Sequence, residues 1–120
     1  MTILLPEVLA VRHGGEGGNH VFLDLRVPAG LAHFPGHFPD LPILPGVVQI
    51  DWAVRYARTH YPISGNFTAL ENIKFLALVL PDARIELALD WQPAKSRLDF
   101  AFSTSQRKYS SGRIVFGGVA

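Results

Sequence analysis

The stretch that decides the fold is Gly36-His37-Phe38-Pro39-Asp40-Leu41-Pro42-Ile43-Leu44-Pro45-Gly46-Val47-Val48-Gln49-Ile50-Asp51. Its first half is rich in proline, which cannot continue a helix and interrupts a sheet ladder, so we expect an ordered loop there. Its second half opens an apolar pattern at helical spacing, made of Val47, Ile50, Val54, Ala57 and Tyr61. Because Pro62 stops this pattern, we predict one helix of about four turns, with Gly46 as its N-cap.

Strands are expected on both sides of this helix. Two β-rich stretches, residues 8–12 and 21–27, flank the glycine run at 14–18 and predict a hairpin. After the helix, apolar and polar residues alternate in 85–91 and again in 98–102, and turn signals separate these stretches. This pattern predicts about four strands in a meander. The expected α+β architecture is therefore two strands, one helix and four strands, with the helix covering one face of one sheet.

Composition limits the class of protein. At 120 residues and 48% hydrophobic content, the chain fits a single domain spanning residues 1–120. Its 11 Lys plus Arg and 10 Asp plus Glu are scattered along the sequence, which argues against a nucleic-acid partner. Cys is absent, which excludes disulfides and a cysteine nucleophile and favours the cytoplasm. We recognise no leader and no apolar run of roughly 20 residues, so no membrane span is expected.

Three residues of the quoted stretch are candidates for chemistry. His37, held between prolines and aromatic residues, is positioned before any substrate arrives and can act as a base. Asp51 is expected on the core-facing side of the helix, where burial favours the neutral carboxylic acid, a proton donor. Gly46 opens the helix without a side chain, so its N–H can meet an oxygen that becomes negative. Together these groups suit β-elimination from a thioester, although a loop histidine and a helix aspartate can meet in many folds.

The quoted stretch resembles the signature of bacterial 3-hydroxyacyl-acyl-carrier-protein dehydratases: G-H-F-P-x-x-P, then Ile or Val, then Met or Leu, then P-G, and farther on an acid. Glu71-Asn72-Ile73-Lys74-Phe75 and then Val79-Leu80-Pro81 look like the family's next strand, so the resemblance covers most of the chain. It implies the hot-dog fold, an antiparallel sheet of about five to six strands wrapped around one long central helix. The Val-Val-Gln-Ile-Asp-Trp-Ala stretch and the short chain look more like the stand-alone dehydratases of aryl-polyene or related polyketide-like clusters than like those of housekeeping fatty-acid synthesis.

The resemblance also implies roles for individual residues. His37 would take the C2 proton, Asp51 would protonate the departing hydroxyl, the Gly46 amide would hold the thioester oxygen, and the Ile43 carbonyl would orient the His37 ring. The implied reaction converts (3R)-hydroxyacyl thioesters to trans-2-enoyl thioesters in fatty-acid or aryl-polyene biosynthesis. The substrate would be carried on the phosphopantetheine of acyl carrier protein, with no other cofactor. Asp40 stands where the family usually has Gly, which puts the specificity in doubt.

The resemblance further implies a dimer whose two sheets join edge to edge, with the histidine of one subunit opposite the acid of the other. Two alternatives remain open. A hot-dog thioesterase would use a carboxylate and an activated water, without the His-Phe-Pro loop. A partner subunit of a heterodimeric dehydratase would contribute only an interface. The expected assembly is thus a homodimer or a heterodimer with another hot-dog subunit.

Other conspicuous residues receive simpler interpretations. His33 is expected to be structural or exposed, and His13, His20 and His60 are expected at the surface. No group of His and carboxylates has metal-ligand spacing, so no metal is expected. Aromatic residues in a chain this small usually fill the core or an interface, and we expect this of Trp52, Phe75 and Trp91.

Overall fold

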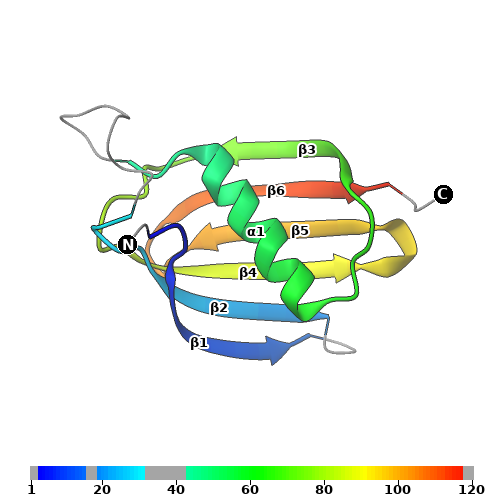
Figure 1. The fold of residues 1–120 in the computed structure, drawn as a ribbon, viewed down its shortest axis with the longest axis horizontal. Coiled ribbons are helices and arrows are strands. Elements are labelled where there is room, and N and C mark those ends of the chain that lie inside the picture. Colours follow the sequence, from blue (N-terminus) through cyan, green and yellow to red (C-terminus); the bar gives the residue numbers. More distant parts are fainter. Residues whose placement is uncertain (1–2, 16–18, 32–42, 118–120) are drawn as a thin grey trace.

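The computed structural model describes residues 3–15, 19–31 and 43–117, which form one sheet and one long helix (Figure 1). The strands are β1 (Glu7–Gly14), β2 (His20–Arg26), β3 (Phe67–Phe75), β4 (Arg84–Gln92), β5 (Arg97–Ser103) and β6 (Lys108–Phe116). The helix α1 (Gly46–His60) follows β2 and precedes β3. The predicted order of two strands, one helix and four strands is confirmed.

All six strands belong to one antiparallel sheet, in the order β1-β2-β4-β5-β6-β3. The predicted hairpin is confirmed, since β1 pairs with β2 and places His13 opposite Val21. The predicted meander is correct for β4, β5 and β6 but wrong for β3, which pairs with β6 at the far edge of the sheet. The place beside β4 belongs to β2. The helix ends near β2, and the connection at residues 61–66 then leads the chain back to β3 at the opposite edge of the sheet (Figure 1).

The core lies between α1 and one face of the sheet. Strands β2, β4 and β5 bury alternate residues, as a strand with one covered face requires. Trp52 of α1 is fully buried, and its indole N–H donates to the carbonyl oxygen of Leu4 at 3.2 Å. Trp91 of β4 is buried as well, so the expected core position is confirmed for both tryptophans. Phe75, by contrast, is 52% exposed.

The helix has the predicted length, but a different face of it is buried. Pro45 is the N-cap and Gly46 is the first helical residue, so the predicted N-cap lies one residue too late. The buried residues of α1 are Gln49, Trp52, Ala53 and Ala57. Val47, expected in the core, is 73% exposed because it is two residues from Gln49, about 200° around the helix. The small Ala53 and Ala57 allow α1 to approach the sheet closely.

Candidate active site

Three of the predicted site residues, Ile43, Gly46 and Asp51, lie within the described part of the chain. His37 and His33 lie outside the described residues, so their roles stay predictions. The described residues gather at the N-terminal end of α1. Ile43 and Gly46 line one hollow, and Asp51 follows Gly46 about one and a half turns later.

Asp51 lies on the exposed face of α1. Its side chain is 62% exposed in the single chain, so the prediction of a buried acid is wrong for one subunit alone. The reason is helix geometry, because Asp51 is two residues from the buried Gln49 and therefore points away from the sheet. The guanidinium of Arg55, one turn farther on, approaches the Asp51 carboxyl group to 3.8 Å. Exposed pairs of this kind contribute little to stability.

The N-terminal end of α1 is open. Its first turn has no side-chain cap hydrogen bond and no acidic residue. The N–H of Val48 donates to the Pro45 carbonyl oxygen at 3.1 Å, whereas the N–H groups of Gly46 and Val47 begin the helix without a preceding turn and lie at the positive end of the helix dipole. A β-carbon added to Gly46 would lie within 3.0 Å of three ring carbons of Phe75. Glycine fits this position because the phenyl ring occupies the space of a side chain.

A hollow of about 400 Å³ opens beside this end of the helix. Its lining combines the turn before α1, the first residues of α1 and the end of β3: Ile43, Leu44, Pro45, Gly46, Val47, Gln49, Phe75, Ala77 and Leu78. The lining is apolar except for Gln49, as in many sites for apolar ligands. Another hollow, of about 450 Å³, includes Asp24, Arg84 and Glu86 but no residue of the stretch 36–51. The hollow beside Gly46 is therefore the candidate substrate site.

Sequence reasoning missed two residues of this hollow. The sequence predicts a place for Phe75 in the core or an interface, and no pattern in the sequence predicts its contact with Gly46. Gln49 was given no role, although a polar residue between apolar helix positions was a usable signal. Its side chain is buried, with Nε2 donating to the Leu44 carbonyl and Oε1 accepting from the Ser110 hydroxyl.

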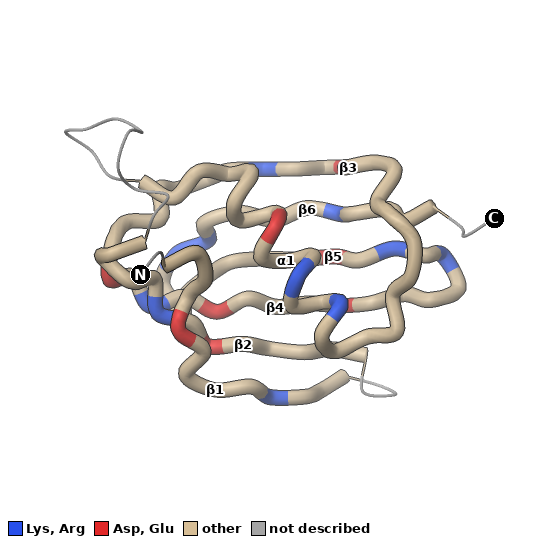
Figure 2. Tube along the Cα trace, in the orientation of Figure 1, with Lys and Arg blue, Asp and Glu red and all other residues tan. Residues whose placement is uncertain are grey.

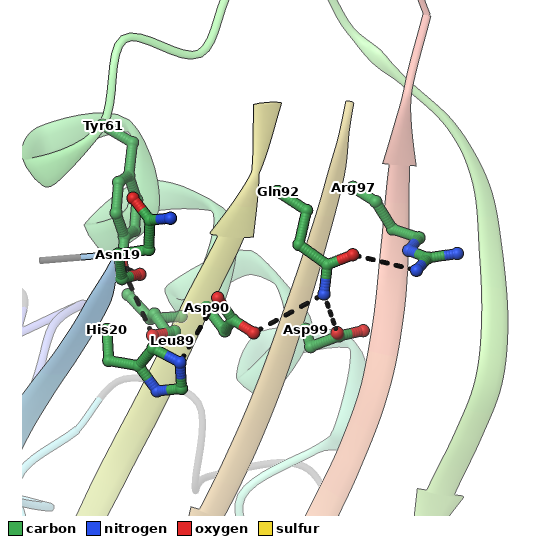
Figure 3. Close-up of polar contacts among 8 residues, drawn as sticks. All are labelled: Asn19, His20, Tyr61, Leu89, Asp90, Gln92, Arg97 and Asp99. Atoms are coloured by element: carbon green, nitrogen blue, oxygen red, sulfur yellow. Dashed lines mark hydrogen bonds and ion pairs between the residues drawn. The ribbon is translucent and has the colours of Figure 1, made fainter. Parts of the chain in front are cut away.

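A second polar cluster lies on the face of the sheet that points away from α1 (Figure 3). His20 Nε2 lies 3.6 Å from the Asp90 carboxylate, and Gln92 Nε2 donates to Asp99 at 2.9 Å. Arg97 donates to the side-chain oxygen of Gln92 at 2.9 Å, which extends the cluster across three strands. These are ordinary cross-strand polar pairs, and they share no residue with the hollow beside Gly46.

The remaining histidines contact each other beyond the site. The rings of His13 and His60 meet edge to face with centroids 5.8 Å apart. Burial, and then the nearby His13, lower the pKa of His60. Within residues 3–15, 19–31 and 43–117, no group of three or more His, Asp or Glu residues could hold a metal ion.

Charged residues of both signs are interspersed over the described elements (Figure 2). Arg12 of β1 pairs with Asp24 of β2 and Glu86 of β4. Arg26 of β2 pairs with Glu7 of β1 and with Asp82 in the turn before β4. In the part of the chain that the structure describes, no helix has the length and apolar character needed to cross a membrane.

The family model of ApeI-like proteins, described as ApeI dehydratase, matches residues 14–113. The chain belongs to this family of dehydratases. The matched region contains His37, Ile43, Gly46 and Asp51, so all predicted site residues of this ApeI-like chain fall within it.

Solved structures share the fold of this ApeI-like chain. A protein from Erwinia carotovora subsp. atroseptica is 35% identical, with a TM-score of 0.85 and coverage of 96% of this chain and 98% of that chain. The dehydratase heterocomplex ApeI:P from Xenorhabdus doucetiae contains a chain 30% identical, with a TM-score of 0.86 and coverage of 95% and 99%. The hot-dog fold implied by the sequence resemblance is confirmed.

A curated relative is 3-hydroxyacyl-acyl-carrier-protein dehydratase FabZ of Rhizobium leguminosarum bv. trifolii. It is 34% identical over 80 residues, which are 59% of this chain and 50% of the relative. The ApeI-like chain spans about half the length of the curated relatives it matches.

Proposed function

We propose that this chain dehydrates (3R)-hydroxyacyl thioesters carried on acyl carrier protein to trans-2-enoyl thioesters, in fatty-acid or aryl-polyene biosynthesis. The match to the ApeI dehydratase model over residues 14–113 supports this activity most directly. His37 and Asp51 are the proposed base and acid. The Gly46 amide is the proposed donor to the thioester oxygen, and the Ile43 carbonyl is proposed to orient His37.

The proposed reaction removes one water molecule. His37 accepts the proton from C2, and the electron pair of that C–H bond forms an enolate whose charge rests on the thioester oxygen. The Gly46 N–H donates a hydrogen bond to this oxygen, which stabilises the charge. When the enolate collapses, the C2–C3 double bond forms and the C3–O bond breaks, while Asp51 donates the proton with which the hydroxyl leaves as water. His37 then releases its proton and Asp51 takes one up.

A second hot-dog subunit is proposed to complete the site. Asp51 faces solvent in a single chain, whereas an acid that must stay protonated works best where water is excluded. Exposed apolar side chains surround the hollow, among them Val47, Phe75 and Leu78, each at least 50% exposed. Burial of this surface under a second chain would stabilise an assembly. It would also exclude water from the Asp51 carboxyl group.

The edge strand β3 is the proposed line of contact. It is the last strand of the sheet, so one side of its backbone is available to a further strand. The similar ApeI:P structure is named a heterocomplex, which supports a partner that is itself a hot-dog subunit. Acyl carrier protein is the proposed second partner, because the FabZ relatives are named for substrates on that carrier.

Incubation with a 3-hydroxyacyl-carrier-protein, followed by mass spectrometry of the carrier, tests the activity. We expect the wild type to remove one water, and His37→Ala and Asp51→Asn each to be slower by roughly 100-fold or more. His20→Ala and Asp90→Asn are matched controls, since this pair lies on the face away from α1 and should keep wild-type activity.

Native mass spectrometry of the same samples identifies the assembly that is assayed. If the folded, assembled wild type instead releases a free acid from the carrier, the activity is that of a thioesterase and not of a dehydratase. If the folded wild type leaves short and long hydroxyacyl substrates unchanged, alone and with a co-purified hot-dog subunit, the proposed activity is wrong.

A further inference from the structure

We propose that Gln49 is a positioning residue of this site: its side-chain amide fixes the turn at residues 43–46, which carries the Ile43 carbonyl and the Gly46 amide. The inference rests on the proposed function, which gives those two backbone groups their roles. It concerns a side chain that is buried under the helix, whereas Asp51 lies on the exposed face of α1.

The Gln49 amide is held at both ends. Gln49 is 3% exposed, and its Nε2 donates to the carbonyl oxygen of Leu44 at 3.2 Å. Its Oε1 accepts a hydrogen bond of 2.7 Å from the hydroxyl of Ser110, which is 1% exposed on β6. The side chain therefore ties the turn before the helix to a strand of the sheet.

Leu44 is held from a second side as well. Its N–H donates to the carbonyl oxygen of Val79 at 2.9 Å, in the connection between β3 and β4. Both backbone groups of Leu44 are thus hydrogen-bonded: its N–H to the Val79 carbonyl oxygen and its carbonyl oxygen to the Gln49 side chain. Ile43 is the preceding residue and Gly46 lies two residues later, so a shift of Leu44 would move both groups of the proposed site.

Packing alone does not account for an amide at this position. The other buried residues of α1 are Trp52, Ala53 and Ala57, and an unbranched apolar side chain would fill the same volume as Gln49. A buried amide must give up its water, and its new hydrogen bonds do little more than compensate for that loss. The amide adds an interaction that depends on geometry, because a hydrogen bond fixes the position of the Leu44 carbonyl, whereas an apolar contact would let this carbonyl shift.

Three variants separate positioning from packing. Gln49→Met keeps the length of the side chain and removes both hydrogen bonds. Gln49→Glu retains an acceptor for Ser110, but only its protonated form can donate to the Leu44 carbonyl. Gln92→Met is the matched control, since it makes the same change at another hydrogen-bonded side-chain amide, on the face of the sheet away from α1.

In the assembled enzyme, we expect Gln49→Met to lower kcat by about ten-fold or more with KM nearly unchanged. The kcat of Gln49→Glu relative to the wild type should fall as pH rises, because ionisation removes its donor. Gln92→Met should keep kcat close to the wild type even where its Tm falls as far as that of Gln49→Met. Equal losses of kcat in Gln92→Met and Gln49→Met, in step with Tm, would overturn the positioning role.

Hydrogen–deuterium exchange without substrate distinguishes failure of this inference from failure of the proposed function. We expect peptides that cover residues 43–48 to exchange about ten-fold faster in Gln49→Met and at the wild-type rate in Gln92→Met. If the wild type proves to lack dehydratase activity, these exchange rates still decide whether Gln49 fixes the turn. Unchanged exchange in Gln49→Met would refute it, whatever reaction the protein catalyses.

Discussion

The phenyl ring of Phe75 rests against Gly46, in the space that a side chain at position 46 would fill. Phe75 is the last residue of β3 and Gly46 is the first residue of α1, so the contact joins the edge strand to the start of the helix. The ring is also one wall of the hollow beside the helix. One side chain thereby belongs both to the candidate substrate site and to the surface proposed to meet a second subunit.

We expect Gly46→Ala to reduce activity far more than stability. Alanine favours a helix over glycine by up to about 1 kcal/mol, and the added methyl group displaces only an exposed ring that can swing outward. The free energy of unfolding of Gly46→Ala, measured by urea denaturation, should therefore differ from that of the wild type by less than about 1 kcal/mol. The displaced ring reshapes the hollow, so kcat/KM should fall about ten-fold or more.

Gly14→Ala is the matched control for this prediction. A β-carbon at Gly14 would meet the Phe22 ring at 3.4 Å, an ordinary contact at the opposite edge of the sheet. We expect this variant to keep the wild-type kcat/KM. Wild-type kcat/KM in Gly46→Ala as well would show that the fit between Phe75 and Gly46 does not matter for the reaction.

Tyr61, directly after α1, should stabilise the fold through its hydroxyl. The hydroxyl lies against the carbonyl oxygens of Asn19 and Leu89, and Tyr61 is 9% exposed (Figure 3). Tyr61→Phe removes the hydroxyl donor from both carbonyls, although the Trp91 N–H still donates to that of Asn19 at 3.4 Å, so we expect a loss of about 1 kcal/mol in the free energy of unfolding. Urea unfolding at neutral pH measures it, with Tyr109→Phe as the control.

The same hydroxyl should make the protein sensitive to alkali. Burial, and then the charge of Asp90, raise the pKa of Tyr61 to about 12, above its ordinary value of 10.0. The unfolded chain then loses this proton at lower pH than the folded chain. The contribution of Tyr61 to the free energy of unfolding is therefore fully present below pH 10. It falls by on the order of 2 kcal/mol as the pH rises toward 12. Between these pH values, the stability of Tyr61→Phe should fall less steeply than that of the wild type; equal slopes would contradict the assignment.

The sequence predicted those parts of the fold that depend on local pattern. Alternation in 85–91 and 98–102 became β4 and β5, and the apolar run after the prolines became α1, because backbone geometry alone sets these periods. The place of β3 beside β6 could not be predicted in this way. It depends on the path of residues 61–66, which lead from the end of α1 to the opposite edge of the sheet, and tertiary packing sets this path (Figure 1).

The candidate site was predicted to a similar extent. The motif located Ile43, Gly46 and Asp51 at one end of one helix, and the structure brings Ile43 and Gly46 to the same hollow. The predicted burial of Asp51 is wrong for a single chain, because the prediction counts from Val47, which is itself exposed on α1. The place of Phe75 in the site could not be predicted, because Phe75 is 29 positions from Gly46 in the sequence and local sequence patterns do not report contacts over that separation.

Asn72 should be replaceable by glycine but not by a β-branched residue. Its φ of +54° lies in the left-handed region, where the pairing of β3 with β6 slips between Glu71 and Lys74. We expect Asn72→Gly to change the free energy of unfolding by less than about 0.5 kcal/mol, and Asn72→Val to lower it by about 1–2 kcal/mol. Thr68→Val, on the same strand and also exposed, is the control and should not be destabilising.

Leu70→Lys should weaken the proposed assembly without unfolding the subunit. Leu70 is 43% exposed on the edge strand β3, and lysine on an edge strand opposes pairing with another sheet. We expect native mass spectrometry to show a shift toward single subunits and the dissociation constant to rise about ten-fold or more, with thermal unfolding of the subunit little changed. Val8→Lys is the matched control, because Val8 is 42% exposed on β1 at the opposite edge of the sheet.

Activity should follow the assembly in these variants. If a second subunit completes the site around Asp51, Leu70→Lys loses activity at low protein concentration and recovers it as concentration rises, because mass action restores the dimer. Val8→Lys should show the same activity per subunit as the wild type at every concentration. If Val8→Lys dissociates and Leu70→Lys stays assembled, the interface lies at β1. A second subunit would then not cover Asp51 as proposed.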